Sequence, residues 1–104
     1  MGILSIFGFG NGKIKQALQN GAVIIDVRTA YEFDQGKIRG SINIPVDRIL
    51  ASVERIRQMH KPIVICSTSD YRGDKAAAIL KAKGIKEVYN GGSWTHVLRL
   101  LNSL

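Results

Sequence analysis

Short runs of apolar, mostly β-branched residues alternate along the chain with segments in which apolar residues recur every three or four positions. The first pattern is typical of strands buried on both faces of a parallel sheet, and the second of amphipathic helices. The pattern predicts strands over 22–27, 41–44, 63–66 and 85–89, and helices over 11–20, 29–36, 46–56, 73–83 and 93–104. This alternation predicts an α/β fold, with a small parallel sheet of about four to five strands flanked by helices on both faces.

Local signals mark several ends of these elements. Thr29 is followed three residues later by Glu32, which predicts a capping box at the start of a short helix that closes at Gly36. The Asn-Gly-Gly sequence at 90–92 predicts a turn, after which Ser93 caps the last helix. The predicted helices over 29–36 and 93–104 therefore each have a local signal where they begin.

A length of 104 residues predicts one domain over 1–104, and a hydrophobic fraction of 45% suffices for a packed core without a disulfide or a structural metal. Residues 1–10 are apolar and predict an N-terminal arm, flexible or lying as a lid over the core. This run is far shorter than a membrane-spanning helix, and it lacks a basic flank. We therefore expect no stable membrane insertion.

The charge balance indicates an anionic partner without identifying it. Lys and Arg number 15 and Asp and Glu 8, which gives a net charge of +7. The basic residues are scattered rather than gathered in a run with interleaved aromatics, so we expect no nucleic-acid binding. His60 and His96 have no second ligand at metal spacing, so no metal site is predicted. The single cysteine, Cys66, excludes an internal disulfide and suits a reducing, cytoplasmic compartment.

Cys66 ends the predicted strand 63–66 and is followed by a polar loop and the start of a helix. Ligands bind beyond the carboxyl ends of parallel strands, and loop amides with a helix N-terminus favour an anion there. Such a position predicts a lowered pKa and a reactive thiolate for Cys66, with Arg72 as a bidentate cation for an oxyanion. The alternative interpretation is that Cys66 is a small apolar residue ending a buried strand. The predicted anion cradle consists of Ser67, Thr68, Ser69, Asp70, Tyr71, Arg72 and Gly73.

Two ordered series of residues resemble the rhodanese-like family of single-domain sulfurtransferases, from Gly21 to Trp94. The first series is Asp26-Val27-Arg28, Glu32-Phe33, Gly36-Lys37-Ile38-Arg39-Gly40-Ser41 and Ile42-Asn43-Ile44-Pro45. The second is Cys66, Arg72-Gly73, Lys75-Ala76-Ala77 and Val88-Tyr89-Asn90-Gly91-Gly92-Ser93-Trp94. Lys37 replaces the usual His and Ser41 the usual Ala, both at positions that serve a turn.

The resemblance implies a sulfurtransferase without a cofactor. The Cys66 thiolate would attack the outer sulfur of a small anionic donor such as thiosulfate, release sulfite and become a persulfide. The loop amides would stabilise the persulfide charge, and Arg72 would hold the donor. Cyanide, a small thiol or a protein thiol would accept the sulfur. Asp26 and Arg28 at the end of the first strand, with Glu32, are predicted to form either an ion-pair network that braces the site or a plain surface network.

One departure from the family keeps alternatives open. The family's sulfurtransferases usually have four residues between the cysteine and the arginine, whereas five separate Cys66 from Arg72. A Cys-x5-Arg loop is the spacing of the rhodanese-fold phosphatases and related arsenate reductases. Ile65 stands where the phosphatases commonly have His, and Asp70 would repel a bound dianion. The flanking residues favour sulfur transfer, with oxyanion chemistry and a catalytically inactive binding module as the alternatives.

Overall fold

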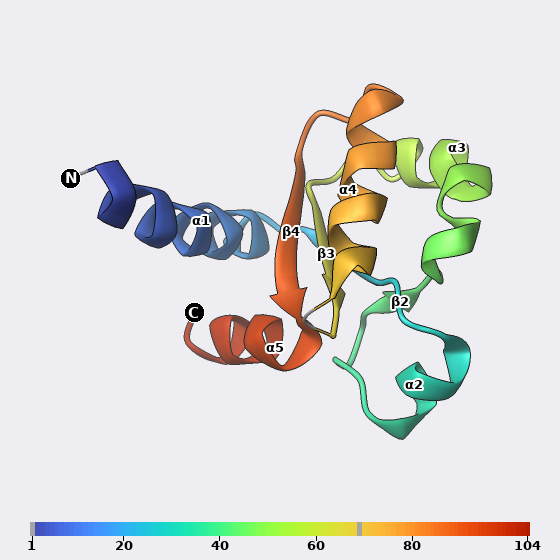
Figure 1. Ribbon diagram of the computed structural model, residues 1–104, viewed down its shortest axis with the longest axis horizontal. Helices are drawn as coiled ribbons and strands as arrows, with labels where there is room; N and C mark the ends of the chain where they lie inside the picture. Colours follow the sequence, from blue (N-terminus) through green and yellow to red (C-terminus); the bar gives the residue numbers. More distant parts are fainter. Residues whose placement is uncertain (1, 69) are drawn as a thin grey trace.

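The computed structural model describes residues 2–68 and 70–104, with side chains from residue 11 onward. Four strands form one sheet in the order β2-β1-β3-β4, and every pairing is parallel. The strands are β1 (Val23–Asp26), β2 (Ile42–Asn43), β3 (Ile63–Ser67) and β4 (Val88–Ser93). The helices are α1 (Gly2–Gln19), α2 (Ala30–Gln35), α3 (Val53–Arg57), α4 (Tyr71–Ala82) and α5 (Trp94–Asn102) (Figure 1). The predicted fold class is confirmed.

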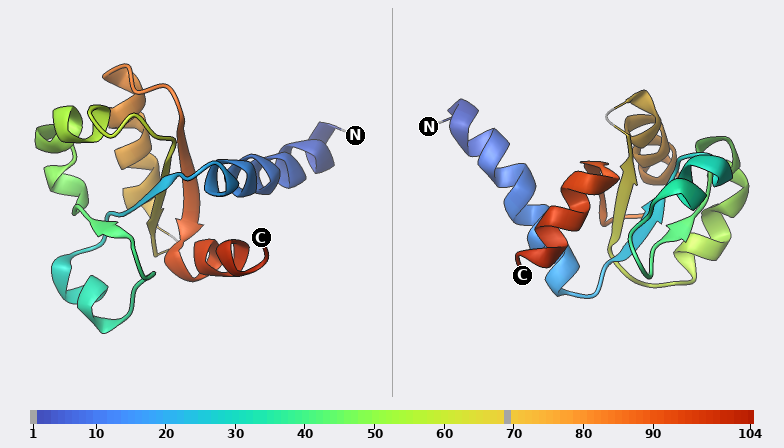
Figure 2. Two further views of the ribbon diagram at one scale, coloured as in Figure 1. Left: turned by 180° about the vertical axis from the view of Figure 1, so that it is seen from behind. Right: turned by 90° about the horizontal axis from the view of Figure 1, so that it is seen from below.

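Helices cover both faces of the sheet because its central strands are apolar on both sides. Ile25, Ile63 and Ile65 pack in one cluster with residues of α3 and α4. Ile24 and Val64 face the other way, into a cluster with residues of α1 and α5. Figure 2 shows the sheet between these two helical layers. All five residues of β3 are buried, so this strand is the centre of the domain.

The N-terminal helix differs from its prediction. Helix α1 begins at Gly2 and ends at Gln19, so residues 2–10 continue the helix predicted to open near residue 11. Residues 2–10 therefore form a helical arm that projects away from the sheet rather than a lid over the core (Figure 1). No proline interrupts residues 2–19, and a helix that has already nucleated extends at little cost. None of the helices in the described part of the chain has the length and apolar character needed to cross a membrane.

The helix predicted over 46–56 is broken. Residues 46–57 form two 3₁₀ turns, Val46–Arg48 and Leu50–Ser52, and then the short helix α3. The Ser52 hydroxyl donates to the Arg48 carbonyl oxygen at 2.9 Å, and Ser52 itself leaves helical geometry with φ −100° and ψ 3°. A serine that bonds backbone in this way competes with regular helix, which explains the break.

The turn predicted at 90–92 is also wrong, because β4 continues through these residues to Ser93. The strand follows the sheet closely at Gly91, where a Cβ atom would lie 2.5 Å from Val97 Cγ2 and 3.1 Å from the Ile65 carbonyl oxygen. Glycine is thus required for contact between strand and helix α5. The register between β3 and β4 shifts beside it, between Ile65 and Ser67.

Candidate anion loop at the carboxyl edge of the sheet

Asp26 and Arg28 form a buried ion pair at the carboxyl end of β1. Asp26 is fully buried and Arg28 is 4% exposed. Arg28 Nη2 lies 2.7 Å from Asp26 Oδ2, and Nε lies 2.9 and 3.0 Å from the two carboxylate oxygens. The Arg28 amide donates to Asp26 Oδ1 at 3.0 Å. The pair is therefore a rigid, satisfied unit of the kind that tolerates burial.

The same guanidinium fixes the segment that follows β1. Arg28 donates to the carbonyl oxygens of Glu32 at 3.1 Å and Gly36 at 2.7 Å, so it holds both ends of α2. The Cζ atom of Arg28 lies 4.9 Å from the centroid of the Trp94 ring, which adds a cation–π contact. Trp94 also covers Gly36, where a Cβ would lie 3.2 Å from the ring. Arg28 thus connects the end of β1 to α2 and Trp94, and the bracing of the site by Asp26 and Arg28 stays a prediction.

Helix α2 positions the side chain of Glu32 beside the loop. The predicted capping box is present: the Glu32 amide donates to Thr29 Oγ1 at 3.2 Å, and the Thr29 amide donates to Glu32 Oε1 at 2.9 Å. The same carboxylate accepts from Arg72 Nη1 at 2.6 Å and Nη2 at 3.1 Å. These bonds, chiefly those from Arg72 and then the Thr29 amide, lower the pKa of Glu32 to about 2. Glu32 therefore stays ionised and joins α2 to the start of α4.

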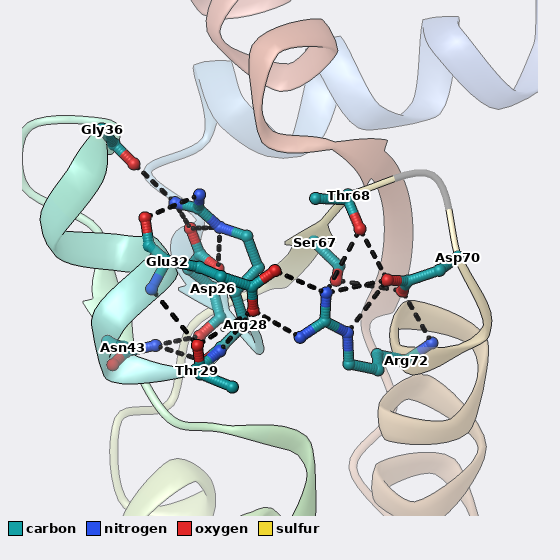
Figure 3. A network of polar contacts seen from close by, with 10 residues as sticks. All are labelled: Asp26, Arg28, Thr29, Glu32, Gly36, Asn43, Ser67, Thr68, Asp70 and Arg72. Atoms are coloured by element: carbon teal, nitrogen blue, oxygen red, sulfur yellow. Dashed lines mark hydrogen bonds and ion pairs between the residues drawn. The ribbon is translucent and has the colours of Figure 1, made fainter.

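Asp70 occupies the predicted anion cradle. Its carboxylate caps α4 by accepting from the Arg72 amide at 3.0 Å, and it accepts from the hydroxyls of Ser67 and Thr68 (Figure 3). Arg72 also donates to Asp70 Oδ2 from Nε at 3.0 Å and from Nη2 at 2.8 Å. Five donors thus converge on one carboxylate, the arrangement that a bound oxyanion would otherwise use.

These bonds fix the charge states in the loop. The pKa of Asp70 lies well below its usual range, first because of the side-chain bonds from Arg72. The pKa of Arg72 is raised above its ordinary value by Glu32 and then by Asp70. Arg72 is 15% exposed and stands between two carboxylates. Its positive charge is therefore already balanced within the chain.

Cys66 lies in the core rather than in the loop. Its side chain has no exposed surface, and it packs in the cluster that includes Ile14, Val64 and Val97. Burial raises the pKa of the Cys66 thiol far above its ordinary value; the charge of Asp26 raises it further, and that of Arg28 partly offsets this. The predicted lowering of this pKa is wrong, because the thiol faces the α1 and α5 layer. The geometry matches the alternative interpretation of Cys66 as a small apolar residue.

Ser67 was predicted only as one member of the anion cradle. It ends β3, is 1% exposed, and its hydroxyl donates to Asp70 Oδ1 at 3.1 Å (Figure 3). Four residues separate Ser67 from Arg72, which is the family's usual spacing between nucleophile and arginine. Counting back from Arg72, rather than forward from the cysteine, would have found this position.

The other predicted loop residues take different roles. Tyr71 is 68% exposed at the first position of α4. Gly73 is buried against β4, where a Cβ would lie 2.6 Å from Asn90 Oδ1, so Gly73 serves packing. Ser69 lies outside the described residues. In the described part of the chain, no three His, Cys, Asp or Glu side chains gather in a way that could hold a metal ion.

A cavity of about 360 Å³ adjoins Arg72. Its lining combines apolar and polar side chains, and Tyr71, Arg72 and Lys75 of α4 belong to it together with Thr29 and Asp47. The lining includes Val27, Pro45, Val46, Tyr71, Arg72 and Lys75. This is the usual place for a ligand in an open parallel sheet.

The parallel sheet, the braced first strand and the loop before α4 define a rhodanese-type domain. Residues 11–95 match the sequence profile described as Rhodanese-like domain, and the chain belongs to this family. The fold is also that of the human single-domain sulfurtransferase TSTD1, with a TM-score of 0.66 and 23% identity over 85% of this chain and 91% of that one.

Two curated relatives carry different names. The YqhL protein of Bacillus subtilis (strain 168) is 36% identical over 69 residues, which are 66% of this chain and 54% of YqhL. The dual specificity phosphatase ibp1 of Schizosaccharomyces pombe is 43% identical over 61 residues, covering 55% of this chain and 44% of ibp1. The chain therefore spans about half the length of these two relatives.

Proposed function

We propose that this rhodanese-like domain is a non-catalytic binding module, in which Ser67 stands at the position of the family's sulfur-carrying cysteine. One observation carries the proposal: Ser67 closes the base of the loop, while the thiol of Cys66 is buried on the α1 and α5 side. Sulfur transfer needs a thiolate that can attack a sulfane sulfur and then carry it as a persulfide. A serine hydroxyl is neither ionised nor a sulfur carrier.

The occupied loop supports the same conclusion. Thiosulfate is a dianion, and it would meet the carboxylate of Asp70 where the loop donors converge. Displacing Asp70 would remove the cap of α4 and one partner of Arg72. The loop therefore holds its own anion in place of a substrate.

Restoring the missing thiol tests the proposal directly. We expect no thiosulfate-to-cyanide transfer from the natural chain, and no added sulfur on its intact mass. The double variant Ser67→Cys with Asp70→Gly creates an open Cys-x4-Arg loop, and it should gain both properties. Ser67→Cys alone is the matched control and should gain less, because Asp70 still fills the loop. Sulfur transfer by the natural chain, abolished in Cys66→Ser, would overturn the proposal.

Sulfur transfer through Cys66 is the second candidate, since the chain belongs to the rhodanese-like family and shares the fold of a single-domain sulfurtransferase. A Cys-x5-Arg phosphatase would use the same residue. Both need Cys66 to reach the loop, so both predict fast alkylation of the native thiol. The binding-module proposal predicts that iodoacetamide modifies Cys66 only after unfolding, whereas the cysteine of the Ser67→Cys, Asp70→Gly variant reacts in the native state.

The binding surface would lie at the carboxyl edge, around the cavity beside Arg72. Tyr71 is exposed at its side, and tyrosine is enriched in protein interfaces. A protein partner captured by the natural chain should be lost with Tyr71→Ala. Tyr31→Ala is the matched control, because Tyr31 is similarly exposed but does not line this cavity. Equal loss with both variants, or none with Tyr71→Ala, would contradict this surface.

A further inference from the structure

A second cavity lies at the opposite, amino edge of the sheet, and the segments that line it are at the top of Figure 1. Its volume is about 250 Å³, and the end of α3, the connection to β3 and the connection from α4 to β4 line it. The chain brings basic side chains to it from all three segments. They are Arg57, His60, Lys61 and Lys86, and the opposing carboxylate in the lining is Glu87.

We propose that this cavity binds a phosphate monoester of a small organic molecule. Arg57, Lys61 and Lys86 outnumber the two nearby carboxylates, which are Glu87 in the lining and Glu54 beside Arg57, so the cavity favours an anion. Ile56, Pro62 and Ile85 add apolar surface to the lining, which suits an organic group attached to the phosphate. The volume lies just under the roughly 300–1,000 Å³ of drug-sized sites, so the organic group must be small. The site is separate from the carboxyl-edge loop and does not rest on the function proposed for it.

Arg57 is positioned before any ligand arrives. Its Nε lies 3.1 Å from Glu54 Oε2, and its Nη2 donates to the Lys83 carbonyl oxygen at 2.9 Å. Neither of these bonds uses Arg57 Nη1. This nitrogen lies beside Gly84 in the cavity lining, 3.8 Å from the position that a Cβ atom on residue 84 would occupy. A guanidinium fixed on two sides loses little freedom when its remaining nitrogen binds an oxyanion.

His60 provides an independent observation. Among the described non-glycine residues it alone has a positive φ, 52°, the left-handed conformation that glycine adopts without strain. A helix ending commonly places glycine in this conformation. The imidazole of His60 thus stands in the lining at a position that glycine would occupy more easily, and its ring can donate an N–H to a phosphate oxygen.

The test is a titration followed by backbone amide NMR shifts, with inorganic phosphate and phenyl phosphate as separate probes. We expect phenyl phosphate to bind more tightly than inorganic phosphate, and to shift the amides of Lys61, Gly84 and Lys86. Lys86→Gln should weaken binding about threefold, and Glu87→Gln should strengthen it about as much. Lys37→Gln is the matched control, because it removes the same charge at an exposed position that lines neither cavity, and it should change nothing.

His60→Gly separates binding from folding. It relieves the strained φ, so the melting temperature should stay the same or rise while phenyl phosphate binding weakens. Unchanged binding in this variant would overturn the role of His60. The site would be overturned by an absence of shifts at millimolar phenyl phosphate, or by shifts centred on Ser67–Arg72 instead. Equal effects of Lys37→Gln and Lys86→Gln would also overturn it. Vesicles containing phosphatidic acid that shift these amides when phenyl phosphate does not would assign the cavity to a lipid surface and overturn the proposed ligand.

Discussion

Asp26-x-Arg28 and Asp70-x-Arg72 make the same local set of hydrogen bonds beside the carboxyl ends of neighbouring strands. In each, the aspartate accepts from the arginine's own amide at 3.0 Å, and from its Nε and Nη2. Asp26 ends β1, and Asp70 follows β3, which pairs with β1. The two units differ in burial: side-chain exposure is 4% for Arg28 and 0% for Asp26, against 15% for Arg72 and 31% for Asp70.

The two Asp-x-Arg ion pairs have different roles because they differ in burial. Inside the domain, each charge of the Asp26 and Arg28 pair would be costly without the other, so the unit holds β1 and α2 in place. At the rim, water competes for the charges of Asp70 and Arg72, so this unit contributes less to folding. It determines instead what the loop can bind, because its carboxylate stands where an external anion would.

Breaking the buried unit should have the largest effect. Arg28→Met leaves Asp26 as an unpaired buried carboxylate, and we expect it to lower the free energy of unfolding by about 3–5 kcal/mol. Arg72→Met removes the corresponding side-chain bonds to Asp70, together with those to Glu32, at the more exposed rim and should cost about 1 kcal/mol. Urea unfolding measures both. Equal losses of unfolding free energy in the two variants would show that burial does not determine how much each ion pair stabilises the fold.

Asp70 can be dissected further, because its carboxylate both caps α4 and pairs with Arg72. Asp70→Ala removes both contributions and should cost about 1 kcal/mol. Asn caps helices as well as Asp does, so Asp70→Asn should lose only the ion pair, a few tenths of a kcal/mol. Thermal unfolding of the two variants compares these effects. An Asn variant as unstable as the Ala variant would show that charge rather than capping dominates.

The sequence was sufficient for the fold because its signals are local. Apolar runs, the capping box at Thr29 and the serine cap at Ser93 are each readable within a few residues, and the structure has them. The course of β4 was not readable, because it depends on the contact of Gly91 with Val97, which only the tertiary structure brings together. Local pattern therefore predicts elements better than it predicts where two elements touch.

The candidate site was predicted in its residues but not in its orientation. Strand 63–66 is apolar at every position, so no alternation indicates which face Cys66 occupies. Only packing against α1 and α5 decides that the thiol faces the core. The ion pairs that close the loop also join segments 40 residues apart, as in Glu32 and Arg72, which spacing alone does not reveal.

Acid should weaken the rim unit by a small, measurable amount. Glu32 has a folded pKa of about 2, against about 4.3 in an unfolded chain, and the folded pKa of Asp70 is also depressed. Above the unfolded values these carboxylates are ionised in both states, so their full contribution is present. As the pH falls from about 5 towards 2, the unfolded chain takes up protons first, and stability is lost.

Because Glu32 and Asp70 are 33% and 31% exposed, solvent reduces this loss to a few tenths of a kcal/mol for each. The melting temperature of the natural chain should therefore fall through this pH window more steeply than that of a Glu32→Gln, Asp70→Asn double variant. Added salt should narrow the difference, because exposed charges are screened. Parallel curves for the two proteins would assign the acid sensitivity to carboxylates outside the rim, and the contrast between the two Asp-x-Arg units would then lose its electrostatic basis.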